Sequence, residues 1–266
     1  MMGFAVIVGE IIALKGTLLV SPSIFGFVTA FTLCASSMVI NDYYDRMIDK
    51  VNEPNRPIPS GLIKPSETVN YAILLATVGL AVALFTNLYS LLVATLIFIL
   101  STFYNRAGKK AGFWGNLMVS GCVAIPFLYG AFIVDLTPGG PLMVFALLAF
   151  LANTGREIIK GMSDVTGDKI RGIKTLAIRY GLRKTAYASG PFYASAVIIS
   201  IYPWLSGMVS ILYLPFIMFA DFGFLYSAVS IARRPIKENA KRVKKLSLIW
   251  MLAGLLAFVF GGFILP

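Results

Sequence analysis

The chain has 266 residues, of which 58% are hydrophobic and only 13% are charged, and its mean hydropathy is +0.82. Because soluble domains carry about 25% charged residues, this composition excludes an ordinary soluble protein and indicates an integral membrane protein. The net charge of +11 would suit a nucleic-acid-binding protein. However, the basic residues are confined to a few short segments between apolar runs, so we exclude that class. The chain contains no histidine, which argues against haem ligation and against a histidine base.

Nine apolar runs follow one another along the chain, and most have the roughly 17–25 residues that a helix needs to cross a bilayer. They are continuous rather than alternating, which predicts helices and not barrel strands. The sixth run is short and is expected to continue into 156–160. We therefore predict an all-α polytopic membrane protein, a nine-transmembrane-helix bundle that forms a single domain over residues 1–266. The runs cover roughly residues 3–20, 22–41, 68–86, 88–104, 114–134, 140–155, 186–204, 207–230 and 246–265.

The first run has no charged segment before it and no clear cleavage site, so we interpret it as a retained helix rather than a signal peptide. Cys34 and Cys122 both lie inside predicted spans, so no disulfide framework or metal cluster is expected from them. Three ionisable residues also fall within predicted spans, namely Glu10, Lys15 and Asp221. Such groups are costly in lipid, but we place none of them in a functional site. For Asp221, lining a pocket and making a structural hydrogen bond remain equally open.

The basic residues are distributed asymmetrically between the loops. Of the 23 Lys and Arg residues, 22 fall in four segments, and Lys15 is the exception. With nine spans these segments all lie on one side of the membrane, which the positive-inside rule assigns to the cytoplasm. The N-terminus is then predicted inside and the C-terminus outside. The four segments are residues 42–67, 105–113, 156–185 and 231–245.

Two acidic clusters lie at the cytoplasmic ends of matching spans. Asp42, Asp45 and Asp49 fall within roughly 60° of one another on a helix. Like charges at this spacing repel by a few tenths of a kcal/mol per pair. Asp164 and Asp168 repeat the spacing of Asp45 and Asp49 in the second half of the chain, which indicates a weak internal repeat. A solvated polar helix end would explain one such cluster, but two clusters in matching places favour a shared function.

The chemistry that fits two facing carboxylate clusters is the handling of a diphosphate through Mg²⁺, a hard ion that bridges carboxylates to phosphate oxygens. Basic side chains of the same layer would complete the neutralisation. A neutralised diphosphate can leave an allylic carbon, and the resulting cation needs a dry pocket with aromatic faces. No strong base is required, because the cation activates the acceptor. The candidate basic residues are Arg56, Lys109, Lys160 and Lys174, and the candidate aromatic residues are Tyr43, Tyr44, Tyr104 and Tyr129.

Four ordered stretches resemble motifs of the UbiA superfamily of intramembrane prenyltransferases. NDYYDRMID resembles the N-D-x-x-D-x-x-x-D motif, NRPIPSG the Arg-Pro loop after it, YNRAGKKAGFWGN the stretch between the fourth and fifth helices, and SDVTGD the second, D-x-x-x-D, motif. The resemblance covers about residues 25–265, including the helix count. It implies Mg²⁺-dependent transfer of a prenyl group from its diphosphate to an acceptor at a site in the membrane.

The resemblance assigns roles to matching positions. It implies metal binding and catalysis by Asp42, Asp45, Asp49, Asp164 and Asp168, and diphosphate binding by Asn41, Arg56, Lys109, Asn116 and Lys160. Two departures affect these assignments. Gly161 stands where many members have another Asp, so the number of metal ions or the activation of the acceptor could differ. Family members usually carry a further Arg-Pro-type segment before the first helix, whereas only Met1 and Met2 precede Gly3, so a site residue there would be missing or displaced.

REIIKGMSDVTGDKIRGIKTLAIRYG most resembles the archaeal branch of this family. That branch joins geranylgeranyl diphosphate to the free hydroxyl of geranylgeranylglyceryl phosphate and makes the second ether bond of archaeal lipids. NEPNRPIPSG also resembles the chlorophyll synthase branch, so chlorophyllide and aromatic quinone precursors stay open as acceptors. A transporter is the alternative of another class, and a non-catalytic lipid-binding or scaffold protein is a third. We expect a multi-pass protein of the cell membrane with its site on the cytoplasmic side, and no nucleic-acid or obligate protein partner.

Overall fold

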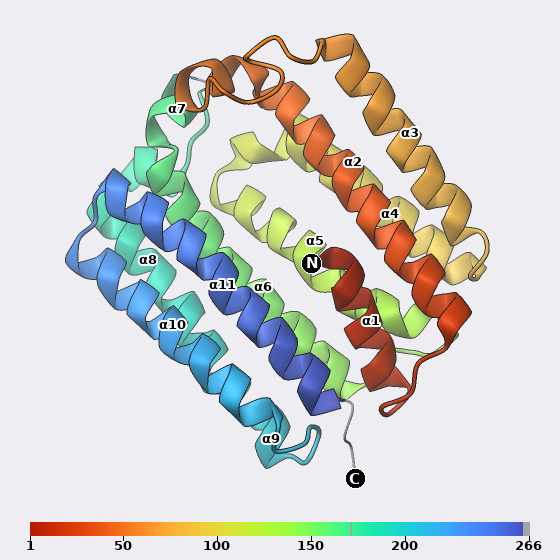
Figure 1. Cartoon of the computed structure of the whole chain (residues 1–266). Coiled ribbons are helices and arrows are strands. Elements are labelled where there is room, and N and C mark those ends of the chain that lie inside the picture. The colour runs from red at the N-terminus through yellow and green to blue at the C-terminus, as the bar shows by residue number, and fades with distance from the viewer. Residues whose placement is uncertain (171, 263–266) are drawn as a thin grey trace.

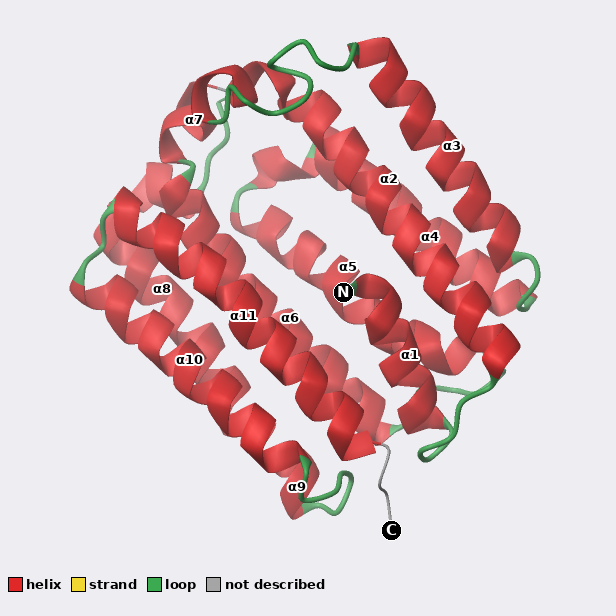
Figure 2. Cartoon of the chain, in the orientation of Figure 1, coloured by secondary structure: helices red, strands yellow, loops and turns green. Residues whose placement is uncertain are grey.

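The computed structural model describes residues 1–170 and 172–262. Every regular element in these residues is a helix, and the helices are joined by short loops (Figures 1 and 2). The prediction of an all-α fold is therefore confirmed. The elements are α1 (Met2–Ala13), α2 (Val20–Asn52), α3 (Pro65–Ala83), α4 (Leu88–Arg106), the 3₁₀ helix η1 (Gly108–Ala111), α5 (Phe113–Phe132), α6 (Gly140–Ser163), α7 (Val165–Ile170), α8 (Leu176–Ser200), α9 (Tyr202–Leu205), α10 (Tyr213–Arg233) and α11 (Lys237–Gly262).

A helix occupies each of the nine predicted spans within the described part of the chain. Seven of these helices are long and apolar enough to cross a membrane, namely α2 to α6, α10 and α11. The helix α8 is also long, but it begins at Leu176, well before the predicted start, and its first turns carry Arg179 and Arg183. The protein is therefore a multi-pass membrane protein, and nine crossings with the termini on opposite sides stay a prediction.

The first predicted span is wrong in its second half, because α1 has only 12 residues. The chain turns at Lys15 and Gly16, whose φ angles are 51° and 95°, so Lys15 lies outside any span. Glu10 stabilises this turn and is fully buried. Its carboxylate accepts hydrogen bonds from the Leu19 backbone N–H at 2.8 Å and from the Ser23 hydroxyl at 2.6 Å. These bonds give Glu10 a structural role, as a buried polar group requires.

The long helices run along one common direction (Figure 1). The helix α2 packs against α3, α6 against α8, and α10 against α11, while α1 lies against α5. One core cluster joins α5, α6, α10 and α11, where the Phe145 and Phe258 rings stack with centroids 4.1 Å apart. The loops with the basic residues gather at the upper left end of the bundle in Figure 1. This arrangement agrees with the predicted placement of the four basic segments on one side of the membrane, which stays a prediction together with the nine crossings.

Two glycines allow α1 and α5 to touch along their backbones. A Cβ atom on Gly130 would lie 2.3 Å from the Val6 carbonyl oxygen, and one on Gly9 would lie 2.1 Å from the Phe127 carbonyl oxygen. Small residues permit such close helix packing in membranes, where dispersion contacts drive helix association. The position of α1 therefore depends on glycine at this crossing.

We predict that Gly130→Ala destabilises the protein by about 1–3 kcal/mol or more, because the added methyl group meets rigid backbone. Gly121→Ala on the same helix is the matched control, since a Cβ atom there has no neighbour within 4 Å. Thermal unfolding of both variants in detergent measures the difference. Equal melting temperatures for the two variants would contradict the close approach of α1 and α5.

Candidate active site

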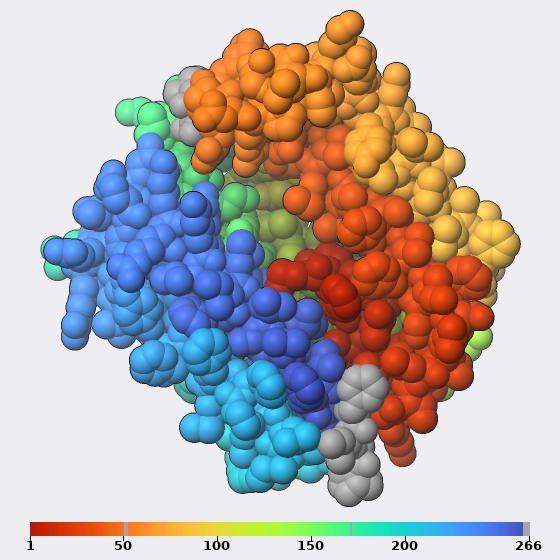
Figure 3. All heavy atoms as spheres, in the orientation of Figure 1, coloured from red at the N-terminus to blue at the C-terminus, as the bar shows by residue number. Residues whose placement is uncertain are grey.

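Two adjoining cavities lie within the bundle. A polar cavity of about 200 Å³ lies at the end with the basic loops. An apolar cavity of about 590 Å³ extends from it between the helices. Figure 3 shows the molecule hollowed between α11 and the segment formed by α1 and α2. Five residues line both cavities and so mark their junction, namely Asn41, Arg56, Tyr104, Glu157 and Lys160.

The polar cavity brings together residues that are far apart in the sequence. Both predicted acidic motifs contribute to its wall, the first from α2 and the second from the end of α6 and from α7. The helix α2 continues well past its apolar run to Asn52, and this extension carries the first motif to the cavity. The acidic residues of the wall are Asp45, Asp49, Glu53, Glu157, Asp164 and Asp168, and the basic residues are Arg56, Lys109, Lys160, Lys237, Lys241 and Lys244.

Basic side chains neutralise the carboxylates of the first motif. Arg56 Nη1 donates hydrogen bonds to Asp42 Oδ1 at 3.0 Å and to Asp49 Oδ2 at 2.8 Å. Lys109 Nζ contacts both the Asn41 side-chain oxygen and the Asp45 carboxylate. Through these pairs the Arg-Pro loop and the η1 segment are each fixed to α2. The position of Asp42 differs from the prediction, because it lines the apolar cavity beside Arg56 rather than the polar one.

The second motif is held in a similar way. Lys244 of α11 donates to Asp164 Oδ1 at 3.2 Å, and the Ser163 hydroxyl donates to the same oxygen at 2.6 Å. Burial, and then the negative charge of Asp164, raise the pKa of Asp168 to about 6. A second negative charge is thus disfavoured at this place unless a positive ion is close by.

The residues present fit a hard divalent cation, because carboxylate and amide oxygens are the donors that Mg²⁺ prefers. In the described residues no three acidic or cysteine side chains lie close enough together to form a ready-made metal cluster. Instead, Lys109, Arg56 and Lys244 occupy carboxylate oxygens of the motifs. A cation that bound at these oxygens would take the place of these basic side chains.

The segment that follows α4 places two predicted residues on the wall of the polar cavity, Lys109 from η1 and Asn116 from the first turn of α5. Gly112 in this segment has a φ of 61°, and a Cβ atom on it would lie 2.4 Å from the Lys174 carbonyl oxygen. Only glycine fits this position. The side chain of Lys174 is exposed and lines neither cavity. The structure therefore does not bring Lys174 to the site, since its backbone rather than its charge makes the contact with this segment.

The UbiA prenyltransferase family matches residues 2–263. The chain belongs to this family. Two relatives named digeranylgeranylglyceryl phosphate synthase are similar over nearly the whole chain. The protein from Methanocaldococcus jannaschii is 34% identical over 96% of this chain and 89% of its own, and the protein from Methanopyrus kandleri is 37% identical over 97% and 93%. Family membership makes the protein a prenyltransferase and sets aside the transporter alternative.

Solved structures agree with the fold. A structure described as digeranylgeranylglyceryl phosphate synthase in membranes is 33% identical, with a TM-score of 0.77 over 98% of this chain and 93% of that one. A UbiA homologue from Aeropyrum pernix is 17% identical, with a TM-score of 0.79 over 96% and 97%. A UbiA homologue from Archaeoglobus fulgidus bound to DMAPP and Mg²⁺ is 20% identical, with a TM-score of 0.63 over 97% and 95%. The two more distant likenesses bear on the fold alone.

Of the four candidate tyrosines, Tyr104 and Tyr129 line the apolar cavity. Tyr104 also lies at the junction of the two cavities, where an aromatic face is close to the carboxylate motifs. Tyr43 and Tyr44 pack against each other with ring centroids 5.5 Å apart and line neither cavity. The role of an aromatic ring in stabilising an allylic cation stays a prediction, and Tyr104 is better placed for it than the other three tyrosines.

Polar residues on two helices line the cavities although the sequence did not predict them as site residues. Asn153, Arg156 and Glu157 of α6 line the apolar cavity on the helical turns before Lys160. Their spacing from Lys160 and Asp164 was a usable signal, because these residues fall on one face of a helix. The second group consists of three lysines of α11 that line the polar cavity at a spacing of four and three residues, namely Lys237, Lys241 and Lys244. In the sequence these lysines indicate only which side of the membrane their segment faces.

Gly161 lines the polar cavity but is not required by its surroundings. A Cβ atom on it would meet Thr175 at 3.5 Å, which is ordinary van der Waals contact. We therefore predict that Gly161→Ala keeps the fold and raises stability by up to about 1 kcal/mol, as expected for alanine in a helix. Thermal unfolding in detergent tests this, with Gly112→Ala as the destabilised comparison. A large loss of stability in Gly161→Ala would show that the end of α6 is more crowded than the structure has it.

Proposed function

We propose that the protein transfers a geranylgeranyl group from its diphosphate to the free hydroxyl of geranylgeranylglyceryl phosphate, in a reaction that depends on Mg²⁺. The product carries the second ether bond of archaeal membrane lipids. The observation that supports this most is the polar cavity with two carboxylate motifs directly adjoining a large apolar cavity. The names of the relatives that align over nearly the whole chain support the same reaction. The carboxylate and amide oxygens on the wall of the polar cavity support Mg²⁺ as the cofactor.

The polar cavity would bind the diphosphate. Asp45, Asp49, Asp164 and Asp168 are the residues that would hold Mg²⁺ on its wall, with Asp42 beside them through Arg56. When bound, Mg²⁺ neutralises the diphosphate and makes it a better leaving group. The remaining phosphate oxygens would be bound by Arg56, Lys109, Lys160 and Asn116, which line the same cavity.

The apolar cavity would hold the prenyl chain. Its wall is mostly hydrophobic and excludes water from an allylic cation. Tyr104 at the junction presents an aromatic ring where the bond to the diphosphate would break. Residues of α1 and α11, among them Ala5 and Met251, line this cavity, beside the hollow that Figure 3 shows. A lipid acceptor would enter there from the bilayer, with its phosphate near the cytoplasmic end.

The reaction is tested first with purified protein in detergent, labelled geranylgeranyl diphosphate and Mg²⁺. Geranylgeranylglyceryl phosphate is the acceptor in one reaction, and a hydroxybenzoate or a chlorophyllide in the others. We expect product only with the glyceryl phosphate, loss of product with EDTA, and recovery when Mg²⁺ is restored. Product only with an aromatic acceptor or chlorophyllide would overturn the proposed identity of the acceptor but not the Mg²⁺-dependent prenyl transfer. No product with any acceptor would overturn the proposed function.

The metal-binding role is tested with isosteric changes. We predict that Asp45→Asn or Asp168→Asn lowers kcat by about 100-fold or more, because the loss of a metal ligand exceeds the 10–100-fold effects of outer-shell partners. Asp135→Asn is the matched control, since Asp135 lies in a distant loop with a φ of 56° that asparagine also adopts. All three variants should remain folded, and only Asp45→Asn, which loses its ion pair with Lys109, should melt at a somewhat lower temperature. Activity near the wild-type level in either site variant would remove that residue from the metal site.

A further inference from the structure

Arg156 on α6 is a buried charged side chain with an unused hydrogen-bond donor. Its side chain is 17% exposed, and Nη1 donates to Glu157 Oε1 at 2.6 Å. Its Nε atom is buried and has no hydrogen-bond partner in the described residues. Buried polar groups are nearly always bonded, and an exception calls for an explanation. The explanation that the surroundings favour is a ligand that accepts from this edge of the guanidinium.

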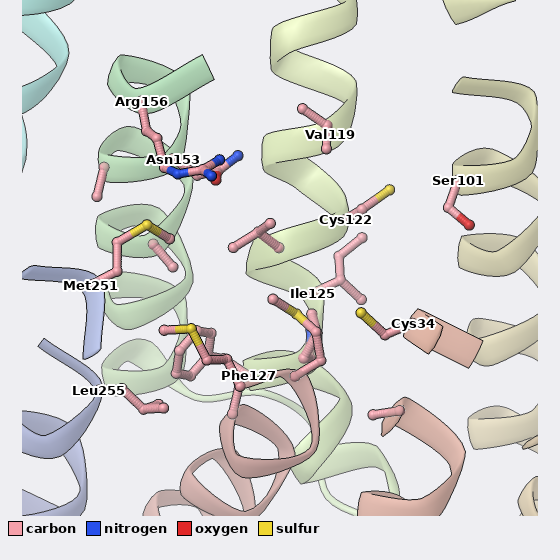
Figure 4. A pocket seen from close by; sticks show the side chains of 18 of the residues that line it. Cys34, Ser101, Val119, Cys122, Ile125, Phe127, Asn153, Arg156, Met251 and Leu255 are labelled. Carbon is pink, nitrogen blue, oxygen red and sulfur yellow. The ribbon is translucent and has the colours of Figure 1, made fainter. Parts of the chain in front are cut away.

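The location of Arg156 supports this explanation. Figure 4 shows Arg156 and Asn153 reaching from α6 into the apolar cavity. Glu157 and Lys160, which follow on the same helix, line both cavities, whereas Arg156 lines only the apolar one. Arg156 therefore lies next to the junction on its apolar side, separate from the basic residues that surround the diphosphate cavity.

Arg156 shares its carboxylate partner with a second cation. Glu157 is 5% exposed and accepts from both Arg156 and Lys160, at 2.6 Å and 3.1 Å. The charge of Arg156 is therefore only partly compensated by Glu157, whereas Lys160 also faces the carboxylates of Asp164 and Asp168. A buried charge is costly unless it is paired. An anion beside Arg156 would supply the missing pairing, and a guanidinium edge matches two oxygens of a phosphate group.

We propose that Arg156 binds the phosphate of the acceptor and thereby selects a phosphorylated glycerol lipid. This inference rests on the proposed function. Because glycerol has only three carbons, the phosphate of the acceptor lies a few bonds from the hydroxyl that reacts. That hydroxyl must reach the allylic carbon at the junction of the cavities. The phosphate of the acceptor must therefore also lie near the junction, on the side away from the diphosphate, which is where Arg156 lies.

The test compares two acceptors that differ only in the phosphate, geranylgeranylglyceryl phosphate and geranylgeranylglycerol. The measured quantity is the ratio of their kcat/KM values in the wild type, in Arg156→Gln and in Arg156→Lys. We expect Arg156→Gln to reduce this ratio by about 10- to 100-fold, the range for a hydrogen bond to a charged group. The KM for geranylgeranyl diphosphate should stay unchanged. Arg156→Lys keeps the charge but loses the planar fork, so it should give an intermediate ratio.

The matched control is Lys245→Gln, which removes an exposed positive charge that lines neither cavity and should leave the ratio unchanged. An equal loss with both acceptors in Arg156→Gln would show a structural role and overturn the inference. A raised KM for geranylgeranyl diphosphate with an unchanged ratio would instead assign Arg156 to the diphosphate and also overturn it. If Arg156→Gln does not fold, the ratio in Arg156→Lys decides. A wild type inactive with both glycerol acceptors would overturn the proposed function itself.

Discussion

The neutralisation of clustered carboxylates is the interaction on which the cytoplasmic end of this bundle depends. Asp42, Asp45 and Asp49 lie on one face of α2, where like charges repel. Arg56 and Lys109, from two different loops, pair with these carboxylates and so fix both loops against α2. The second motif is linked to α11 by an equivalent pair at 3.2 Å, from Lys244 to Asp164. Charge pairing therefore holds two segments against α2 and the second motif against α11, around one cavity.

These pairs also explain how the end of the bundle could accept a highly charged substrate without being rebuilt. A diphosphate with its cations would bring both signs of charge, so each carboxylate and each basic side chain could exchange its present partner for a new one. The side chains of Arg56 and Lys109 are long enough to move while their backbones stay in place. Folding already removes water from these charged side chains, so the helices hold the site preorganised before a substrate binds.

The sequence was informative wherever a residue acts through its helical spacing. The spacing of the Asp residues placed both motifs on helix ends, and the apolar runs gave the positions of the long helices. The sequence was less informative for loops, where the course of the backbone determines which side chains reach the site. Lys174 shares the charge of its neighbours, but its loop contacts Gly112 through a carbonyl oxygen and leaves the side chain outside. Hydropathy likewise predicted a first span that continues beyond Ala13, whereas the helix ends at this residue and the chain then turns.

The residues missed on α6 share one cause, because hydropathy averages a helix over all of its faces. Asn153, Arg156 and Glu157 end an otherwise apolar run, so in a hydropathy profile their polarity marks only the boundary of that run. In the structure this boundary lies at the junction of the two cavities. One face of α6 changes from apolar through Arg156 and Lys160 to the carboxylate of Asp164. A prenyl diphosphate has the same order of groups, with an apolar chain, a reacting carbon and a charged head. Under the proposed function, α6 would align a prenyl diphosphate along its axis, with the reacting carbon at the junction where the side chains change from apolar to charged.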